Sequence, residues 1–222
     1  MENYTIDLAL FDYIPVFLSG LGLYFMVQWM RGVGVAGTQA TLGATLIVLG
    51  GVCKATWKLI WVTTQQDIPI LENVLFLFLG SGFVFLSFAL YQTLRGESVV
   101  SPWRTPLTII AVGLVLAFVM EMVFPGGKRW VFVGVGITTI ANVYYGVRLA
   151  RHCFKIGVHT ASVLLILNLV GIFVMSGLAR ASGQTVGQQW MAEIANTVTQ
   201  LCFALAGWLI YRAYIKAKTV RG

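Results

Sequence analysis

The chain has 222 residues, of which 58% are hydrophobic and only 10% are charged. Soluble domains usually carry about 25% charged residues, so this composition excludes a soluble globular domain, a disordered chain and a disulfide-rich secreted domain. The formal net charge of +7 does not point to nucleic acid, because basic residues gather in the cytoplasmic loops of membrane proteins. We therefore expect an all-α integral membrane protein.

Seven apolar segments are long enough to cross the roughly 30 Å of hydrocarbon in a bilayer. We expect them near residues 11–31, 38–62, 70–93, 104–125, 130–150, 157–180 and 189–213. Because the connections are short, residues 1–222 are expected to form one transmembrane domain. No basic residue precedes the first segment, so we do not expect that segment to be a signal peptide.

The distribution of basic residues predicts the orientation of these helices. If the N terminus is outside, most basic residues fall on the inner side, as the positive-inside rule requires. The inner set is Arg31, Arg95, Arg104, Arg148, Arg151, Lys155, Arg212, Lys216, Lys218 and Arg221, and the outer set is Lys128, Arg129 and Arg180. We therefore predict an N-out, C-in multi-pass protein of the cytoplasmic or plasma membrane.

The chain also shows a pattern typical of an internal repeat. A shift of 120 residues places the first three expected helices on the last three, with Tyr24 on Tyr144 and Arg31 on Arg151. This predicts a parallel 3+1+3 repeat in which the fourth helix is a linker. The plan resembles the group of seven-helix sugar transporters, PQ-loop transporters and microbial-rhodopsin-like proteins. A PQ dipeptide is absent, and residues 199–205 contain no lysine for retinal, which argues against a conventional photoreceptor.

Charged residues inside the expected helices carry the most information about function. Lys54 and Lys58 are one turn apart on the second helix, and Lys54 lies close to mid-membrane. Such charges are costly in lipid and usually face the interior of a bundle, where they find partners. The candidate partners, all in the outer half, are Glu72, Glu121 and Glu193. Trp57, between the lysines, is a packing or ligand-facing residue.

The seventh helix adds a polar stripe at helical spacing. Glu193, Asn196 and Gln200 lie on one face of this helix. Together with the lysines and glutamates, they predict a polar cavity in the outer half of the bundle. The lysines would bind an anionic group that Asn196 and Gln200 orient, or a Lys–Glu pair would exchange a proton. A purely structural alternative also stands, with a static ion pair at Lys54 and a lysine at position 58 that snorkels to the interface.

Other motifs favour simple structural roles. The GxGxxG pattern at 32–37 lies between two membrane helices, so we expect a turn and not a dinucleotide site. His152 and His159 lie near the cytoplasmic edge, and they do not supply the three or four convergent ligands of a metal site. Ser81 and Ser176 have glycine neighbours and no histidine at their depth, so we expect packing sites and no hydrolase. We predict neither enzyme activity nor a cofactor.

Three functions remain open. The first is translocation of a small solute or ion, with Lys54 and Lys58 as the binding centre balanced by the glutamates. The second is a receptor or sensor, opsin-like without the retinal lysine, whose basic tail docks a cytoplasmic partner. The third is an accessory subunit of a larger membrane complex, with grooves lined by Gly20, Gly22, Gly134 and Gly136. The expected partners are the lipid bilayer, a small polar or anionic ligand, and copies of the chain or other membrane subunits.

Overall fold

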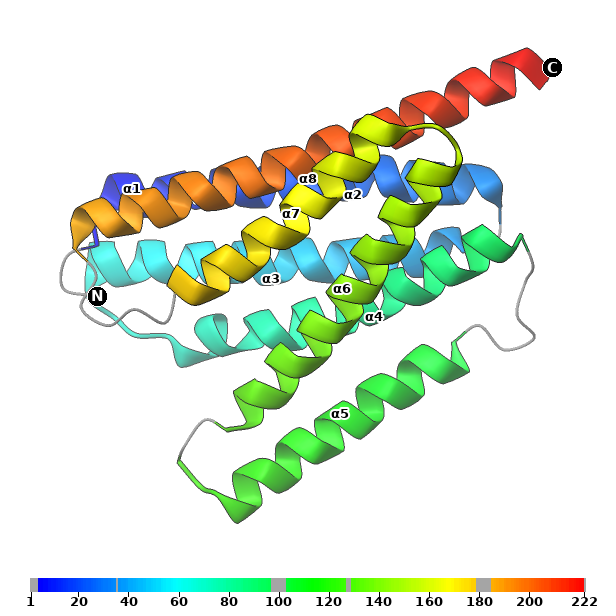
Figure 1. Ribbon diagram of the computed structural model, residues 1–222. Helices are drawn as coiled ribbons and strands as arrows, with labels where there is room; N and C mark the ends of the chain where they lie inside the picture. Colours follow the sequence, from blue (N-terminus) through cyan, green and yellow to red (C-terminus); the bar gives the residue numbers. More distant parts are fainter. Residues whose placement is uncertain (1–3, 35, 97–102, 127–128, 179–184, 222) are drawn as a thin grey trace.

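A computed structural model describes residues 4–34, 36–96, 103–126, 129–178 and 185–221 of the chain. The described residues form an all-helical bundle in which some long helices run nearly parallel and others cross them at an angle (Figure 1). The helices are α1 (Ile6–Phe11), α2 (Tyr13–Val33), α3 (Gly37–Thr64), α4 (Pro69–Arg95), α5 (Arg104–Val123), α6 (Trp130–Lys155), α7 (His159–Leu178) and α8 (Val186–Arg221).

Within the described residues, seven helices are long and apolar enough to cross a membrane. Helices α1 and α2 together make the first of these spans, from Ile6 to Val33, and each later helix makes one more. Because unpaired backbone groups are costly in hydrocarbon, a helical bundle of this kind is one of the few folds that can span a bilayer. The all-α expectation is therefore confirmed for the described residues, and the seven helices of spanning length and hydropathy are those of a multi-pass membrane protein, whereas the orientation and the repeat stay predictions.

The first and last helices differ most from the expected ranges. The first span begins at Ile6 instead of residue 11 and breaks at Asp12, between α1 and α2. Pro15 lies in the first turn of α2 and has no N–H, so it cannot donate to the carbonyl of Phe11 and continue one unbroken helix. The last helix extends to Arg221, because residues 208–221 contain neither proline nor glycine to end it.

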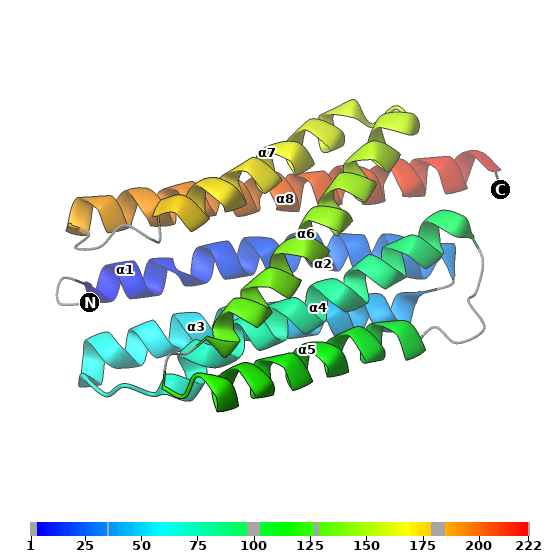
Figure 2. The same ribbon diagram turned by 60° about the horizontal axis from the view of Figure 1, so that its bottom comes forward.

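The helices pack around the bundle in a regular order. Helix α2 contacts α3 and α8, and contacts then connect α3 to α4, α4 to α6, α6 to α7 and α7 to α8. Helix α5 packs against α4 and α6 and lies at the edge of the bundle in Figure 2. We call the end where α3 stops and α4 begins the Lys58 end, and the end where α2 stops and α3 begins the Arg31 end.

Two pairs of glycines bring neighbouring helices into close contact. A Cβ atom added at Gly207 of α8 would lie 2.7 Å from the carbonyl oxygen of Gly22 in α2, and one added at Gly43 of α3 would lie 2.7 Å from the carbonyl oxygen of Gly82 in α4. Small residues of this kind favour helix association in membranes, because they let backbones approach closely. Gly22 thus lies at an interface inside the bundle and not in a lipid-facing groove. Gly134 does so as well, since its Cβ would meet Phe76.

The glycine-rich segment at 32–37 is a turn between helices, as the sequence predicts. Gly34 ends α2 in the left-handed conformation, with φ of 97°, and α3 begins at Gly37. Glycine adopts this backbone conformation without steric cost, which explains its use at the end of α2.

Candidate functional site

A cluster of charged side chains occupies the Lys58 end of the bundle, and Lys58 is its centre. The ammonium nitrogen of Lys58 lies 2.5 Å from Asp12 Oδ2 and 2.9 Å from Glu193 Oε1. The three side chains come from α3, from the junction of α1 and α2, and from α8. Their exposure is low, at 17% for Lys58, 7% for Asp12 and 11% for Glu193. One cation therefore joins three helical segments in a largely buried position.

Local structure places Asp12 on this cation. Asp12 keeps helical backbone angles, φ −56° and ψ −24°, at the one-residue interruption between α1 and α2, and its carboxylate reaches Lys58 of α3. The phenol of Tyr4 donates a hydrogen bond to Asp12 Oδ2 at 2.9 Å, and the Tyr4 ring lies 5.1 Å from the Lys58 ammonium. Burial raises the pKa of Tyr4, although nearby Lys58 opposes the shift. The phenol therefore stays protonated and available as a donor at neutral pH.

Lys54 forms a second, looser ion pair with α4. Its ammonium lies 3.4 Å from Glu72 Oε1 and 4.0 Å from the centre of the Trp57 ring. The indole of Trp57 is buried and donates to Asp67 Oδ1 at 2.9 Å, so Trp57 fixes the turn that follows α3 and also lies against Lys54. The Lys54 and Glu72 side chains are 28% and 30% exposed. This pair is therefore more hydrated than the one around Lys58.

The depth of the two lysines follows from the length of α3. With 28 residues the helix is about 42 Å long, which exceeds the hydrocarbon thickness by roughly 12 Å. Lys58 lies about 9 Å and Lys54 about 15 Å from the last residue of the helix. For a centred helix, Lys58 is near the edge of the hydrocarbon and Lys54 lies several ångströms inside it.

The cluster carries more negative than positive charge. Two ammonium groups face three carboxylates, those of Asp12, Glu72 and Glu193. In the described part of the chain, Glu193 Oε2 is buried and has no hydrogen-bond partner. Because a buried carboxylate oxygen without a partner is costly, this atom is a natural position for a proton or another cation.

Three other predicted site residues lie apart from the ion pairs. Glu121 lies in the last turn of α5, where its Oε1 accepts a hydrogen bond from the Gly126 amide at 3.2 Å, and α5 packs against α4 and α6. Glu121 is therefore not brought to Lys54 or Lys58. Asn196 and Gln200 lie half-buried on α8, about one and two turns beyond Glu193. Their role as orienting ligands stays a prediction.

Sequence reasoning missed Asp12, Tyr4 and Asp67. Tyr4 and Asp67 fall in expected loops, since the first helix was expected near 11–31 and the second near 38–62, and Asp12 falls at the very start of the first expected helix. Asp12 lies in a segment that is otherwise apolar from Leu8 to Val16, apart from Tyr13, and an acid in such a segment is a signal that could have identified it.

The histidines have aromatic neighbours. His152 stacks on Trp29 with 5.7 Å between ring centres, and His159 meets the edge of Phe154 at 4.8 Å. Among the residues that the structure describes, no group of three His, Cys, Asp or Glu side chains could hold a metal ion. These contacts support packing roles for both histidines.

Comparisons with protein family models, with curated proteins and with solved structures find no match for this chain. The charged cluster at the Lys58 end concentrates ionisable side chains where a membrane protein holds them only at a cost in free energy. Any function proposed for the chain has to account for the cluster.

Proposed function

We propose that this chain is a membrane protein that moves a small solute or ion across the bilayer, with the charged cluster as the gate of the Lys58 end. The observation that carries this proposal is the position of Lys58, whose single ammonium group holds Asp12 and Glu193 from different helices. If water or a cargo replaced these carboxylates at the Lys58 ammonium, the ion pair that joins α3 to α8 would break. The proposal includes no catalytic step.

The charge balance of the cluster favours a cation, and a proton in particular, as the ion that moves or drives movement. With an excess of one carboxylate over the ammonium groups, the cluster attracts cations more strongly than anions. The buried Oε2 of Glu193 offers a position for a proton. Protonation of Glu193 would weaken its attraction to Lys58, which couples proton binding to opening of the gate.

The orientation and the repeat belong to the same proposal. Under the positive-inside rule the Lys58 end faces outward and the Arg31 end faces the cytoplasm, which makes the cluster an outer gate in the cytoplasmic membrane. The packing order is compatible with the 3+1+3 plan, since contacts between α4 and α6 would correspond to those between α8 and α2. In that plan α5 is the linker, in agreement with its place at the edge of the bundle.

Proton flux into liposomes tests the proposal directly. The purified protein is reconstituted with a pH-sensitive dye inside the vesicles, and a proton gradient is imposed with the membrane potential clamped. We expect the wild type to accelerate proton entry and Glu193→Gln to abolish the acceleration. Glu121→Gln is the matched control, because it makes the same substitution at the same end of the bundle but outside the cluster.

A second readout follows the gate without knowledge of the cargo. In a background without native cysteines, Asn196→Cys reports access to the part of α8 that lies one turn from Glu193 towards the Arg31 end. We expect slow labelling by a hydrophilic maleimide, and faster labelling when Lys58→Met removes the shared cation. No proton flux together with unchanged labelling would contradict the proposal, and so would equal loss of flux in both glutamate variants.

A receptor is the second candidate, and the shape of α8 favours it. This helix has 36 residues and is about 54 Å long, far more than a bilayer core requires. Its last turns extend beyond the other helices in Figure 1 and expose Arg212, Lys216 and Lys218. Such a basic surface could bind a cytoplasmic partner. A partner that co-purifies with the full chain but not with a variant in which these residues are glutamine would favour signalling over transport.

A further inference from the structure

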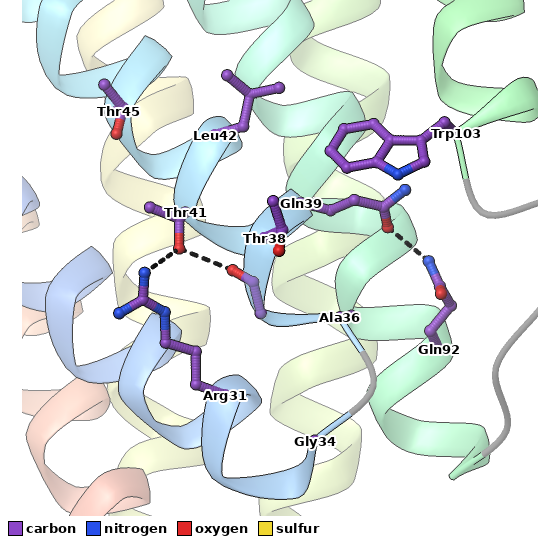
Figure 3. Close-up of a pocket in the computed structure, with 11 residues that line it drawn as sticks. Arg31, Gly34, Ala36, Thr38, Gln39, Thr41, Leu42, Thr45, Gln92 and Trp103 are labelled. Atoms are coloured by element: carbon purple, nitrogen blue, oxygen red, sulfur yellow. Dashed lines mark hydrogen bonds between the residues drawn. The ribbon is translucent and has the colours of Figure 1, made fainter.

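A groove of about 740 Å³ lies at the Arg31 end, far from the charged cluster. It is formed by the end of α2, the start of α3, the end of α4 and the start of α5 (Figure 3). We call it the Arg31 groove, and the residues that matter here are Arg31, Thr38, Thr41, Leu42, Gln92 and Trp103. Its lining combines hydroxyl and amide side chains with apolar ones and includes one cationic side chain, that of Arg31.

Arg31 is exposed at the lining of the groove, and it has no carboxylate partner among the described residues. Its terminal nitrogen donates to Thr41 Oγ1 at 2.9 Å, and Thr41 in turn donates to the Gly37 carbonyl at 2.7 Å (Figure 3). These bonds orient the guanidinium but do not neutralise it. Among the described residues this exposed guanidinium keeps further N–H donors, which suit an oxyanion, in particular phosphate.

The start of α3 adds partial positive charge at the same place. Ala36 precedes the helix and gives no side-chain cap to its first amides. Unpaired amides at a helix N-terminus favour anions, since the helix dipole adds to their hydrogen-bonding capacity. Behind them, the buried Gln92 donates to Gln39 and closes the wall between α3 and α4.

The charges of the described residues at this end agree with an anionic ligand. Every acidic residue that the structure describes lies at the Lys58 end: Asp7, Asp12, Asp67, Glu72, Glu121 and Glu193. The described basic residues of the Arg31 end are Arg31, Arg95, Arg104, Arg148, Arg151, Lys155, Arg212, Lys216 and Lys218. The summed field therefore attracts anions to the surface that contains the groove.

The surface beside the groove indicates what kind of anion fits. Exposed side chains follow one face of α3 at helical spacing, first Thr38, then Leu42 and Thr45, then Leu49 and Val52. This face is polar at the Arg31 end and apolar towards the middle of the bundle. Trp103 stands beside the polar part, as tryptophan does at membrane interfaces. A molecule that matches this surface has an anionic head and a hydrocarbon chain.

We propose that the Arg31 groove binds the phosphate headgroup of an anionic membrane lipid, with an acyl chain along the Leu42–Leu49–Val52 face of α3. Arg31 and the first amides of α3 bind the phosphate, and Thr38 contributes a hydroxyl group. The site is independent of transport at the Lys58 end, because the two lie at opposite ends of α3.

Native mass spectrometry of the full chain in detergent tests this site. Delipidated protein is mixed with phosphatidylglycerol or with zwitterionic phosphatidylcholine, and the bound fractions are compared. We expect a preference for phosphatidylglycerol that falls about five-fold in Arg31→Gln, as the loss of about 1 kcal/mol per basic residue implies. Arg212→Gln is the matched control, since it removes the same charge at the same end but outside the groove.

Two further measurements keep the test decisive. Thr38→Glu places a carboxylate on an exposed position of the groove and should lower phosphatidylglycerol binding as Arg31→Gln does, with the fold intact. Equal effects of Arg31→Gln and Arg212→Gln, or no effect of Thr38→Glu, would show nonspecific attraction and overturn the proposal. Strong competition by inorganic phosphate, with no preference between the two lipids, would show a site for a soluble anion instead.

Discussion

Individual charges at the Lys58 end differ in what their removal should do. From depth alone, Lys54 is expected to matter more than Lys58, because Lys54 lies further into the hydrocarbon. The structure gives the greater weight to Lys58, which is more buried and contacts two carboxylates, whereas Lys54 has one at 3.4 Å. We therefore expect the number and distance of the partners to outweigh the position along the helix.

Replacement of Lys58 by alanine should lower the free energy of unfolding by about 3–5 kcal/mol, because it leaves Asp12 and Glu193 facing each other without a cation. Lys54→Ala is the matched comparison and should cost only about 1 kcal/mol, as expected for a partly hydrated pair. Reversible unfolding in mixed SDS micelles measures both values.

A variant in which Asp12, Lys58 and Glu193 are all neutral distinguishes the effect of unpaired charge on stability from the effect of lost side-chain packing. The triple variant Asp12→Asn, Lys58→Met, Glu193→Gln should recover much of the stability lost in Lys58→Ala, since it leaves no unpaired charge. Equal and small effects of the two lysine substitutions would contradict the structural role of Lys58. Such a result would indicate that both lysines extend their ammonium groups to the membrane interface and need no carboxylate partner.

The sequence predicted part of this cluster at residue level. Lys54, Lys58, Glu72 and Glu193 were recognised as charges inside apolar segments, and the structure places them in ion pairs. Glu121 has the same sequence signature but lies at the end of a peripheral helix. Depth can be estimated from the sequence, but which helices are neighbours depends on packing, which one sequence does not state.

At the scale of elements, helix existence was easier to predict than helix ends. A run of about 20 apolar residues has few alternatives to a membrane helix, so all seven spans were found. The helix start at Ile6 and the interruption at Asp12 were not predicted. Asp12, the partner of Lys58 that is least exposed, lies at the start of the expected range 11–31, where an acid is typical of a polar N-terminal flank.

Packing of α2 on α8 depends on glycine and gives a test at this scale. Gly207→Ala should lower the free energy of unfolding by about 1–3 kcal/mol, because the added methyl group would collide with the backbone of Gly22. Gly136→Ala in α6 is the control, since a Cβ there has no neighbour within 4 Å. That variant should be neutral or up to about 1 kcal/mol more stable, because alanine favours helix.

The same unfolding assay in mixed micelles serves both glycine variants. A destabilised Gly136→Ala would mean that another chain covers that face of α6, as the accessory-subunit interpretation expects. An unchanged stability of Gly207→Ala would mean that α2 and α8 move apart easily. The close contact between Gly207 and Gly22 would then not stabilise the bundle.

At the scale of the whole molecule, charge is strongly divided between the two ends. The described acids lie at the Lys58 end, and most described basic residues lie at the Arg31 end. This division could be read from the sequence once the helices were placed, because alternate connections fall on the same side of a membrane. It predicts that the Lys58 end is outside and the Arg31 end is in the cytoplasm.

Labelling of single cysteines in intact cells tests that orientation. The background replaces Cys53, Cys153 and Cys202 by alanine, and the reporters are Gln66→Cys, between α3 and α4, and Lys155→Cys, at the end of α6. Both positions are exposed, so differences in labelling report the side of the membrane and not burial. A membrane-impermeant maleimide should label position 66 in intact cells and position 155 only after permeabilisation.

The result bears on both ends of the molecule, because the two proposals share one orientation. With the Lys58 end outside, the ion pairs form an outer gate, and the Arg31 groove faces the cytoplasmic leaflet, where anionic lipids give the surface its negative potential. The opposite labelling pattern would turn the cluster into a cytoplasmic gate and would place the groove against the leaflet with less anionic lipid. The lipid would then have to be sought among the anionic components of the outer leaflet, and the positive-inside rule would fail for this chain.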